Sequence, residues 1–400
     1  MGDLHVLPSR GKQIFSFEYD SHWLSRASWP AFDPALQLYG GRQYPVQGTG
    51  NFGVFLDSSP DRWGRVLMMR REAQLARAEN RAERRLLETD YLLGVHDGHR
   101  IGALRFRKDG RFLDDQKEFA APPRTSLREL ENACLQLEKE GAEDNPEYGQ
   151  WLRVLLAPGG SLGGARPKAS VVDEDGQLWI AKFPSLRDEE DVGAWEGVVH
   201  QLARRAGIEV ADAHVRKFAS RHHTFLAKRF DRTAGGGRLH FASAMTMVQR
   251  NDEDGADEGA SYLELAEVLQ QVGSDPARDL EQLWRRQVFS ICISNTDDHL
   301  RNHSFFLNEN GWSLTPAYDL NPERNGEGLK LNISETDNTQ DLDLALEVSS
   351  YYRLKESRAL ELINEVVEAV KTWSEVASAI GLSKTAQDRM KRAFRIAAER

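Results

Sequence analysis

Two aspartates and one asparagine near the C-terminal third have types and spacing that suit phosphoryl transfer. Asp297 precedes Asn302 by five positions in Asn-Thr-Asp-Asp-His-Leu-Arg-Asn (295–302), and Asp319 follows in Leu-Thr-Pro-Ala-Tyr-Asp-Leu (314–320). In protein-kinase-like loops, one Asp orients the attacking hydroxyl, an Asn holds a metal, and a second Asp binds the metals that bridge the phosphates. The spacing therefore predicts a catalytic set of Asp297, Asn302 and Asp319.

The same residues predict a metal site. Mg²⁺ prefers hard oxygen ligands and is usually held by one or two carboxylates together with phosphate oxygens. Asp319 supplies a carboxylate and Asn302 a side-chain oxygen, so we expect Mg²⁺ at these two residues and ATP as the source of the phosphates. Another interpretation stays open for Asp319, because an aspartate in Asp-Leu-Asn-Pro is also a common turn former.

Asp297 and Asp298 are adjacent, and their distance from Asn302 separates them. Asp297 lies five positions before the asparagine, whereas Asp298 lies only four positions before it. We therefore expect Asp297 to face the substrate hydroxyl and Asp298 to support the shape of the loop. The alternative is that Asp-Asp-His after a helix forms only a solvated turn.

A glycine-rich turn and a strand lysine precede these residues in the order that a nucleotide site requires. Residues 159–164 read Gly-Gly-Ser-Leu-Gly-Gly, which is neither a Walker A sequence nor Gly-x-Gly-x-x-Gly, but such a turn lets backbone N–H groups approach phosphates. Lys182 lies between apolar neighbours, where a lysine is costly to bury without an anionic partner. The predicted nucleotide-binding residues are Gly160, Ser161, Gly163, Gly164, Lys168 and Lys182.

Lys182 has two further interpretations. A strand lysine of this kind pairs with a helix glutamate in kinases, and Glu196 is the candidate, although Glu189 and Glu190 are also near in sequence. Alternatively, Lys182 is an edge-strand lysine whose ammonium group stays in water.

Composition sets broader limits. The 400 residues carry 52 Lys+Arg and 62 Asp+Glu, a formal charge of −10, so the overall charge gives no support for direct nucleic-acid binding. Two cysteines cannot form a disulfide framework and suit the reduced cytoplasm. The N-terminus lacks the basic and apolar regions of a signal peptide, and no apolar run is long enough to span a membrane. We expect a cytoplasmic protein without membrane contact.

The hydrophobic pattern divides the chain into three parts, 1–120, 121–255 and 256–400. Expected helices and strands alternate in the first two parts, and the last part is mostly helical. Expected strands are 15–19, 100–107, 169–172, 178–183, 224–230, 304–307 and 312–315. Expected helices are 60–77, 81–93, 126–140, 192–206, 280–292, 357–379 and 384–399. A linker is expected at 114–125, where two prolines occur.

Five short motifs together resemble the HipA family of bacterial toxin kinases. They are 161–168 (Ser-Leu-Gly-Gly-Ala-Arg-Pro-Lys), 180–183 (Ile-Ala-Lys-Phe), 229–232 (Arg-Phe-Asp-Arg), 295–302 and 315–319 (Thr-Pro-Ala-Tyr-Asp). Their order and approximate spacing agree from about residue 15 to the end. Two places depart from the family pattern. Arg166 stands where the family often has Gln, which leaves its role open, and residues 55–62 match the family's segment only loosely.

The resemblance implies an α+β, two-lobed protein-kinase-like fold, similar to the phosphatidylinositol 3/4-kinases, with an N-terminal α/β subdomain of HipA type. It implies a Ser/Thr protein kinase in which Asp297 is the catalytic base, Asn302 and Asp319 bind Mg²⁺, and Lys182 contacts ATP. It also marks Ser161 as an autophosphorylation site.

The resemblance further implies partners. Family members act with a small helix-turn-helix antitoxin that binds operator DNA, so DNA is expected only through the antitoxin complex, and an aminoacyl-tRNA synthetase is the expected protein substrate. Two alternatives stay open: a small-molecule or lipid kinase of the same fold, and a non-catalytic nucleotide-binding corepressor subunit. The arginines of the helix at 60–77 form either a solvated face or a docking patch; they are Arg62, Arg65, Arg70, Arg71 and Arg77.

Overall fold

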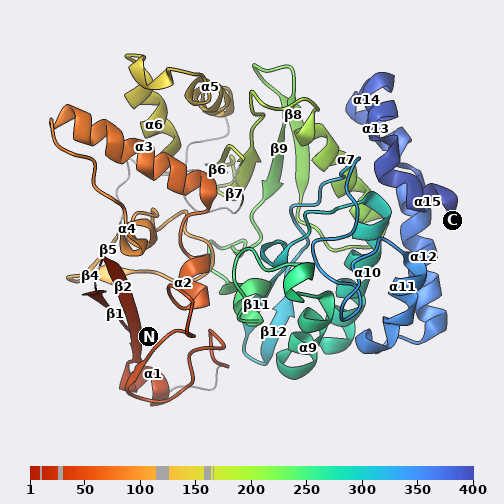
Figure 1. The fold of residues 1–400 in the computed structure, drawn as a ribbon, viewed down its shortest axis with the longest axis horizontal. Coiled ribbons are helices and arrows are strands. Elements are labelled where there is room, and N and C mark those ends of the chain that lie inside the picture. The colour runs from red at the N-terminus through yellow and green to blue at the C-terminus, as the bar shows by residue number, and fades with distance from the viewer. Residues whose placement is uncertain (10, 26–29, 114–125, 157–163, 165) are drawn as a thin grey trace. The chain divides into compact units, whose positions relative to one another are not determined.

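The structure is a computed structural model of residues 1–400, and it describes all of them except 10, 26–29, 114–125, 157–163 and 165 (Figure 1). The chain divides into two compact units. Unit 1 consists of Met1–Ala27, Ala31–Gly193 and Arg216–Phe241, and unit 2 of Ser28–Pro30, Ala194–Val215 and Ala242–Arg400.

These units do not follow the expected boundaries at residues 120 and 255. Residue 120 lies outside the described residues, and most of the first two expected parts belong to unit 1. The division into 1–120, 121–255 and 256–400 stays a prediction.

Unit 1 contains two sheets of more than two strands, a short hairpin and several helices. Its strands are β1 (Gly2–Ser9), β2 (Lys12–Tyr19), β3 (Arg42–Gln43), β4 (Arg107–Lys108), β5 (Arg111–Phe112), β6 (Lys168–Val172), β7 (Leu178–Lys182) and β9 (His223–Lys228). Its helices are α1 (Ser21–Ser25), α2 (Gly53–Asp57), α3 (Arg62–Ala78), α4 (Glu88–Leu93), α5 (Leu127–Leu137), η3 (Ala142–Asp144) and α6 (Tyr148–Leu156). Elements in which the chain passes between units are α7 (Val192–Arg205), β8 (Ala213–Lys217) and β10 (Phe241–Ser243).

The N-terminal sheet has the order β1-β2-β3 and is antiparallel. Alternation along β2 puts Phe15, Phe17 and Tyr19 on one face, and all three are buried. Phe17 contacts Phe32 and Phe55 edge-on or tilted, with ring centroids 5.7 and 5.8 Å apart. This aromatic cluster is the core of the N-terminal part of unit 1.

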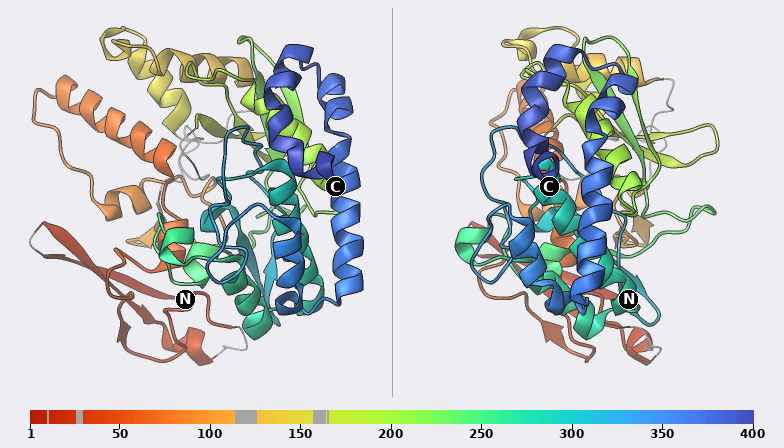
Figure 2. Two further views of the ribbon diagram at one scale, coloured as in Figure 1. Left: turned by 45° about the vertical axis from the view of Figure 1, so that its right-hand side comes forward. Right: turned by 90° about the vertical axis from the view of Figure 1, so that its right-hand side faces the viewer.

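The second sheet has the order β6-β7-β9-β8, and its two faces differ. Side chains of one face pack into a core with α3, α5 and α6, which lie side by side in Figures 1 and 2. The strand residues in this core are Ala169, Val171, Trp179, Ala181 and Leu226. Because side chains alternate along a strand, the opposite face carries Lys168, Lys182 and Phe225. The core face thus fixes the direction in which the two lysines leave the sheet.

Unit 2 is mostly helical and holds the small sheet β10-β11-β12. Its strands β11 and β12 are Ser304–Asn308 and Gly311–Leu314. Its helices are α8 (Ala244–Met247), η4 (Ala256–Glu258), α9 (Tyr262–Val272), α10 (Pro276–Ile293), η5 (Leu300–Asn302), α11 (Leu342–Glu347), η6 (Ser349–Tyr352), α12 (Glu356–Lys371), α13 (Trp373–Ile380), α14 (Lys384–Met390), η7 (Lys391–Phe394) and α15 (Arg395–Glu399).

Helix α10 is the centre of unit 2 and delivers the chain to the predicted catalytic loop. It begins with Asp275 as N-cap, which accepts a hydrogen bond from Arg278 N, and with Pro276 in the first turn. Every residue from Leu283 to Ile293 is buried, so the helix packs on all sides rather than along one stripe. It packs against α9, α12 and α15, and Figure 2 shows α10 and α12 side by side.

Two expected elements are wrong. The helix at 81–93 is reduced to α4, because Glu72 of α3 accepts hydrogen bonds from Arg84 N at 2.9 Å and from Arg81 Nη1 at 2.6 Å, which holds the chain outside a helix. The strand at 100–107 is also absent. There Arg100 is buried and donates to Ser58 O at 2.7 Å, so side-chain bonds replace a strand ladder.

Other differences concern boundaries. The helix expected at 357–379 is interrupted at Thr372, and the one expected at 384–399 is broken into α14, η7 and α15. Within the parts of the chain that the structure describes, no helix combines the length and the apolar character needed to cross a membrane.

Candidate active site

The loop that carries the predicted catalytic residues starts where α10 ends. Ser294 has φ +52°, and Asn295 N donates to Ser290 O at 2.9 Å. A residue in this left-handed conformation stops a helix and turns the chain. The turn leads into η5, at whose start His299 Nδ1 accepts a hydrogen bond from Arg301 N at 3.2 Å. The loop is therefore fixed at both of its ends.

The two adjacent aspartates of this loop differ in exposure. Asp297 is exposed, whereas Asp298 is only 2% exposed. The Asp298 carboxylate accepts hydrogen bonds from Tyr262 Oη at 2.5 Å and Ser290 Oγ at 3.0 Å, and it lies 3.0 Å from His303 Nε2. Burial by itself raises the pKa of Asp298, but His303 and the hydrogen bonds outweigh it and hold this pKa below its ordinary value. Asp298 supports the loop from inside, as its spacing predicts.

Asn302 closes the loop onto Asp297. Its Nδ2 donates to the main-chain oxygen of Asp297 at 3.0 Å, and His299 N donates to the same oxygen at 2.9 Å. This bond uses the amide nitrogen, so Asn302 Oδ1 is a separate acceptor on the same side chain. The five-residue spacing therefore has a structural basis, because Asn302 holds the backbone of Asp297 through its amide nitrogen.

Asp319 is linked to the same loop through its neighbour Tyr318. Tyr318 Oη donates to Arg301 O at 2.7 Å, so the residues that directly precede Asp319 and Asn302 are in contact. Asp319 is half-buried and has φ +58°, a conformation that aspartate tolerates better than most residues. Asn321 Nδ2 donates to its Oδ1 at 3.3 Å. The three predicted catalytic residues thus belong to one linked part of unit 2.

The donor set of these residues can be compared with the needs of Mg²⁺. Among the residues that the structure describes, no group of three or more His, Cys, Asp or Glu side chains could hold a metal. Asn302 and Asp319 provide one amide oxygen and one carboxylate, which are hard donors. Such a sparse set fits Mg²⁺ that shares its coordination with phosphate oxygens and water.

In unit 1, the two predicted lysines are opposite each other on neighbouring strands. Lys168 of β6 and Lys182 of β7 are register partners in an antiparallel pair, and Lys182 is likewise opposite Phe225 of β9. Lys182 is half-buried, with Nζ 5.8 Å from the centroid of the Phe225 ring. Like charges directly opposite on a sheet are destabilising. This position therefore favours negative charge nearby.

Lys168 has such a negative partner, which the sequence did not reveal. Its side chain is 2% exposed, and Nζ lies 3.1 Å from Oδ2 of Asp61. Asp61 is recognisable in the sequence only as part of the start of a helix, and a separation of 107 positions gives no local signal of the pair. The one available indication is general: a buried lysine needs an acid.

The remaining predicted residues fall into two groups. Gly160, Ser161 and Gly163 lie outside the described residues, so their roles stay predictions, whereas Gly164 is described and has φ +84°. Arg166, whose role the sequence leaves open, forms a two-pronged ion pair with Asp188 at 2.8 and 2.6 Å. Arg166 therefore has a structural partner.

Glu196 is 4% exposed on α7 and belongs to unit 2, whereas Lys182 belongs to unit 1. Their predicted ion pair stays a prediction.

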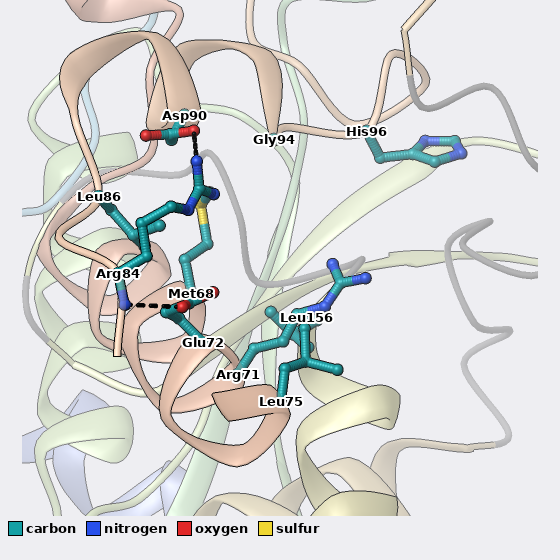
Figure 3. Close-up of a pocket in the computed structure, with 10 residues that line it drawn as sticks. All are labelled: Met68, Arg71, Glu72, Leu75, Arg84, Leu86, Asp90, Gly94, His96 and Leu156. Atoms are coloured by element: carbon teal, nitrogen blue, oxygen red, sulfur yellow. Dashed lines mark hydrogen bonds and ion pairs between the residues drawn. The ribbon is translucent and has the colours of Figure 1, made fainter. Parts of the chain in front are cut away.

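A pocket of about 190 Å³ lies beside α3 and α4 in unit 1 (Figure 3). Its lining residues are Met68, Arg71, Glu72, Leu75, Arg84, Leu86, Asp90, Gly94, His96 and Leu156. Arg84 turns toward Asp90 and pairs with it at 2.9 Å. The pocket contains none of the predicted site residues, and it is smaller than the roughly 300–1,000 Å³ typical of small-molecule sites.

Comparison with known proteins gives the family. The model of the HipA-like C-terminal domain matches residues 160–374, more than half of the chain. The chain belongs to the HipA family. The match includes the described residues Gly164, Lys168, Lys182, Asn302 and Asp319, but Asp61 lies outside it.

Curated relatives of this HipA family member share segments with it. Protein Y4mE of Sinorhizobium fredii is 27% identical over 182 residues, which is 40% of this chain and 41% of the relative. Toxin YjjJ of Escherichia coli is 27% identical over 41% of this chain and 38% of its own length. The serine/threonine-protein kinase toxin HipA of Shewanella oneidensis is 27% identical over 31% of this chain and 33% of its own length. The matches span less than half of each of these relatives.

A solved structure gives the fold. The HipA chain of the Shewanella oneidensis complex of HipA, HipB and operator DNA has a TM-score of 0.70 and 17% identity, and the match covers 100% of this chain and 93% of that chain. At this identity the likeness establishes the fold and not the activity. The expected mixture of helices and sheets in a HipA-type fold is confirmed.

Proposed function

We propose that this HipA family member is an ATP- and Mg²⁺-dependent Ser/Thr protein kinase that acts as the toxin of a toxin–antitoxin pair. The observation that carries the proposal is the closed loop of unit 2, in which exposed Asp297 is held through its backbone by Asn302 and linked through Tyr318 to Asp319. The proposed fold is the two-lobed kinase-like fold, similar to the phosphatidylinositol 3/4-kinases. Names of relatives add support, since one of them is a serine/threonine-protein kinase toxin.

The proposed reaction assigns one task to each residue. The oxygen of the substrate hydroxyl forms a bond to the γ-phosphorus of ATP as the bond from that phosphorus to the β–γ bridging oxygen breaks, and ADP leaves. Asp297 accepts a hydrogen bond from the hydroxyl, orients it, and takes up its proton. Asn302 and Asp319 would hold Mg²⁺, which supplies positive charge against the charge that develops on the phosphates. Lys168, Lys182 and the glycine-rich turn would bind the phosphates.

A phosphoryl-transfer assay with radiolabelled ATP and the purified chain tests the proposal. Label should pass to protein with the wild type and not with Asp297→Asn. Transfer only to a lipid or a small molecule would favour a different kinase of the same fold. Nucleotide binding without any phosphoryl transfer would contradict the proposal that the chain is an enzyme, and it would favour a non-catalytic corepressor subunit.

Partners and substrate belong to the same proposal. The solved relative contains HipB and operator DNA. By analogy we propose a helix-turn-helix antitoxin as partner, DNA binding only through that complex, and an aminoacyl-tRNA synthetase as cytoplasmic substrate. Expression of the wild type in bacteria should stop growth, and co-expression of the antitoxin should restore it. Growth arrest by the Asp297→Asn variant would contradict a toxin that acts by phosphorylation.

A further inference from the structure

The start of α3 is joined to Lys168, the first residue of β6, by a buried ion pair. Asp61 is the N-cap of α3, and its two carboxylate oxygens have separate partners: Oδ1 accepts a hydrogen bond from Gly64 N at 2.7 Å, and Oδ2 lies 3.1 Å from Lys168 Nζ. The side chains of Asp61 and Lys168 are 4% and 2% exposed. One carboxylate thus fixes both the helix start and the ammonium group.

Trp63 provides a second connection between the same two segments. Its indole Nε1 donates to Lys168 O at 3.2 Å, and its backbone N donates to Gly164 O at 3.3 Å. The first turn of α3 therefore holds residues at both ends of the 164–168 stretch.

Gly164, the last residue of the turn, also lies close to the ammonium group. A Cβ atom built on Gly164 would lie 3.1 Å from Lys168 Nζ, and Gly164 has φ +84°. Both facts favour glycine at this position. An anion that meets the Gly164 end of this turn would lie near the Lys168 ammonium, which can donate three hydrogen bonds.

Lysines with long, flexible side chains need a fixed partner to hold one position. In kinases the strand lysine that contacts ATP is oriented by an acid, which leaves it able to donate to the phosphates. The structure gives Lys168 an acid of this kind, but from the N-terminal part of the chain rather than from the helix that follows the sheet. Lys182 is the register partner of Lys168, so the side chains of the two lysines leave neighbouring strands on the same face of the sheet.

We propose that Asp61 is a positioning residue for nucleotide binding, which holds the Lys168 ammonium group against the end of the glycine-rich turn and so makes ATP affinity depend on the first turn of α3. This inference rests on the proposed function, since it takes the nucleotide phosphates as the anion that Lys168 meets. It adds a residue that lies outside the part of the chain matched by the family model.

The variant Asp61→Asn tests it with little disturbance of the helix. Asparagine is as good an N-cap as aspartate, so the bond from Gly64 N is retained while the charge beside Lys168 is lost. The matched control is Asp341→Asn, which makes the same change at the N-cap of α11, where Asp341 accepts a hydrogen bond from Asp343 N. Calorimetric titration of Mg-ATP into each protein gives the dissociation constants directly.

We expect Asp61→Asn to weaken Mg-ATP binding by about tenfold, roughly the 1.4 kcal/mol that one decade represents. The KM for ATP should rise while kcat at saturating ATP changes little, and Asp341→Asn should match the wild type. In the background of Lys168→Met, the change Asp61→Asn should have no further effect on binding, because the two residues act as one unit.

A thermal melt of each variant distinguishes positioning from stability alone. If Asp61→Asn lowers the melting temperature but binds Mg-ATP as the wild type does in the folded state, the ion pair is only structural and the inference is overturned. Additive effects of Asp61→Asn and Lys168→Met on binding would overturn it as well. If the wild type itself binds no Mg-ATP, the proposed function fails, and this inference fails with it.

Discussion

Asp297 and Asp298 are neighbours in the chain, yet one carboxylate is exposed and the other is buried against Tyr262, Ser290 and His303. The two adjacent residues of the same type therefore differ in their surroundings. The buried and hydrogen-bonded aspartate supports the shape of the loop, and the exposed aspartate is the one that we propose meets the substrate. This difference makes the two residues distinguishable by experiment.

Asp297→Asn should abolish phosphoryl transfer while Mg-ATP binding and the melting temperature stay close to those of the wild type, because an exposed carboxylate contributes little to folding. Asp298→Asn should instead destabilise the fold by roughly 1.5–3 kcal/mol, the range for a hydrogen bond to a charged group. At a temperature where both variants are folded, Asp298→Asn should retain more activity. Radiolabel transfer and thermal melts measure both quantities, and equal losses of activity would show that the spacing assigns the wrong aspartate.

Asp319→Asn should weaken Mg²⁺-dependent binding of ATP, since one carboxylate is a large share of a sparse oxygen set. Asparagine is the better replacement because Asp319 has φ +58°, which alanine adopts at a cost of roughly 1–2 kcal/mol. Titrations of ATP with and without Mg²⁺ check the prediction, and only the Mg²⁺-containing titration should change. Unchanged affinity and turnover would leave Asp319 as a turn residue.

Much of the site could be predicted from the sequence because its parts are local. Asp297, Asn302 and the helix that leads to them lie within one short stretch, and the hydrophobic period of α10 and the hairpin of β11 and β12 follow from neighbours in the chain. The predictions that are wrong concern segments whose structure depends on residues distant in the sequence. The helix expected at 81–93 is mostly prevented by Glu72, whose carboxylate binds the backbone of Arg84.

Asp61 is the clearest example of such a long-range effect. Its sequence context indicates only the start of a helix. The structure makes it the N-cap of α3, and its second oxygen meets Lys168 from a segment 107 residues away. No periodicity or motif encodes that distance. For a similar reason, the sequence leaves two interpretations of the arginines of α3, a solvated face and a docking patch. Contacts with other elements decide between these interpretations, and such contacts cannot be read from neighbours in the chain.

Arg65 should matter for folding and Arg77 should not. Arg65 forms a two-pronged pair with Glu88 at 2.9 and 2.7 Å, and its guanidinium lies 4.3 Å from the centroid of the Tyr91 ring. Because both ionic side chains are about a third exposed, Arg65→Ala should cost only about 1 kcal/mol of the free energy of unfolding. Arg77 is exposed, so Arg77→Ala serves as the matched control in urea unfolding. If Arg77→Ala lowered the free energy of unfolding more than Arg65→Ala does, the different roles expected for these two arginines would be contradicted.

Ser161 should acquire a phosphate when the wild type is incubated with Mg-ATP. A phosphoserine there carries roughly −1.5 to −2 charges and would compete with the ATP phosphates for Lys168 and Lys182, so the modified protein should bind ATP more weakly. Intact-mass measurement with peptide mapping locates the phosphate, and Ser161→Ala is the control. An active kinase without phosphate on Ser161, or a modified form with undiminished affinity for ATP, would rule out this form of self-inhibition.

Asp33 should make the stability of the N-terminal part of the chain depend on pH. Burial raises its pKa to about 6, and Asp57 adds to the shift, while hydrogen bonds from Val54 N at 2.9 Å and Ala35 N at 2.7 Å oppose it. The folded state therefore binds a proton more readily than the unfolded state, whose Asp33 has the ordinary value of 3.8. Stability from this group is present below about pH 4 and is lost as the pH rises through about 6.

The measurement must separate Asp33 from a nearby group with the opposite sign. His240 Nε2 lies 3.0 Å from Phe32 O, and burial lowers the pKa of His240 to about 4, so its contribution is lost as the pH falls. The free energy of unfolding is measured in urea for the wild type and for Asp33→Asn, at pH 7 and at pH 5. Because both proteins contain His240, its contribution cancels in the difference between them. Relative to the variant, the wild type should gain about 1 kcal/mol at pH 5. Asp3→Asn, at an exposed position of β1, should follow the wild type, and parallel pH curves for Asp33→Asn and the wild type would show that Asp33 is not protonated in this range.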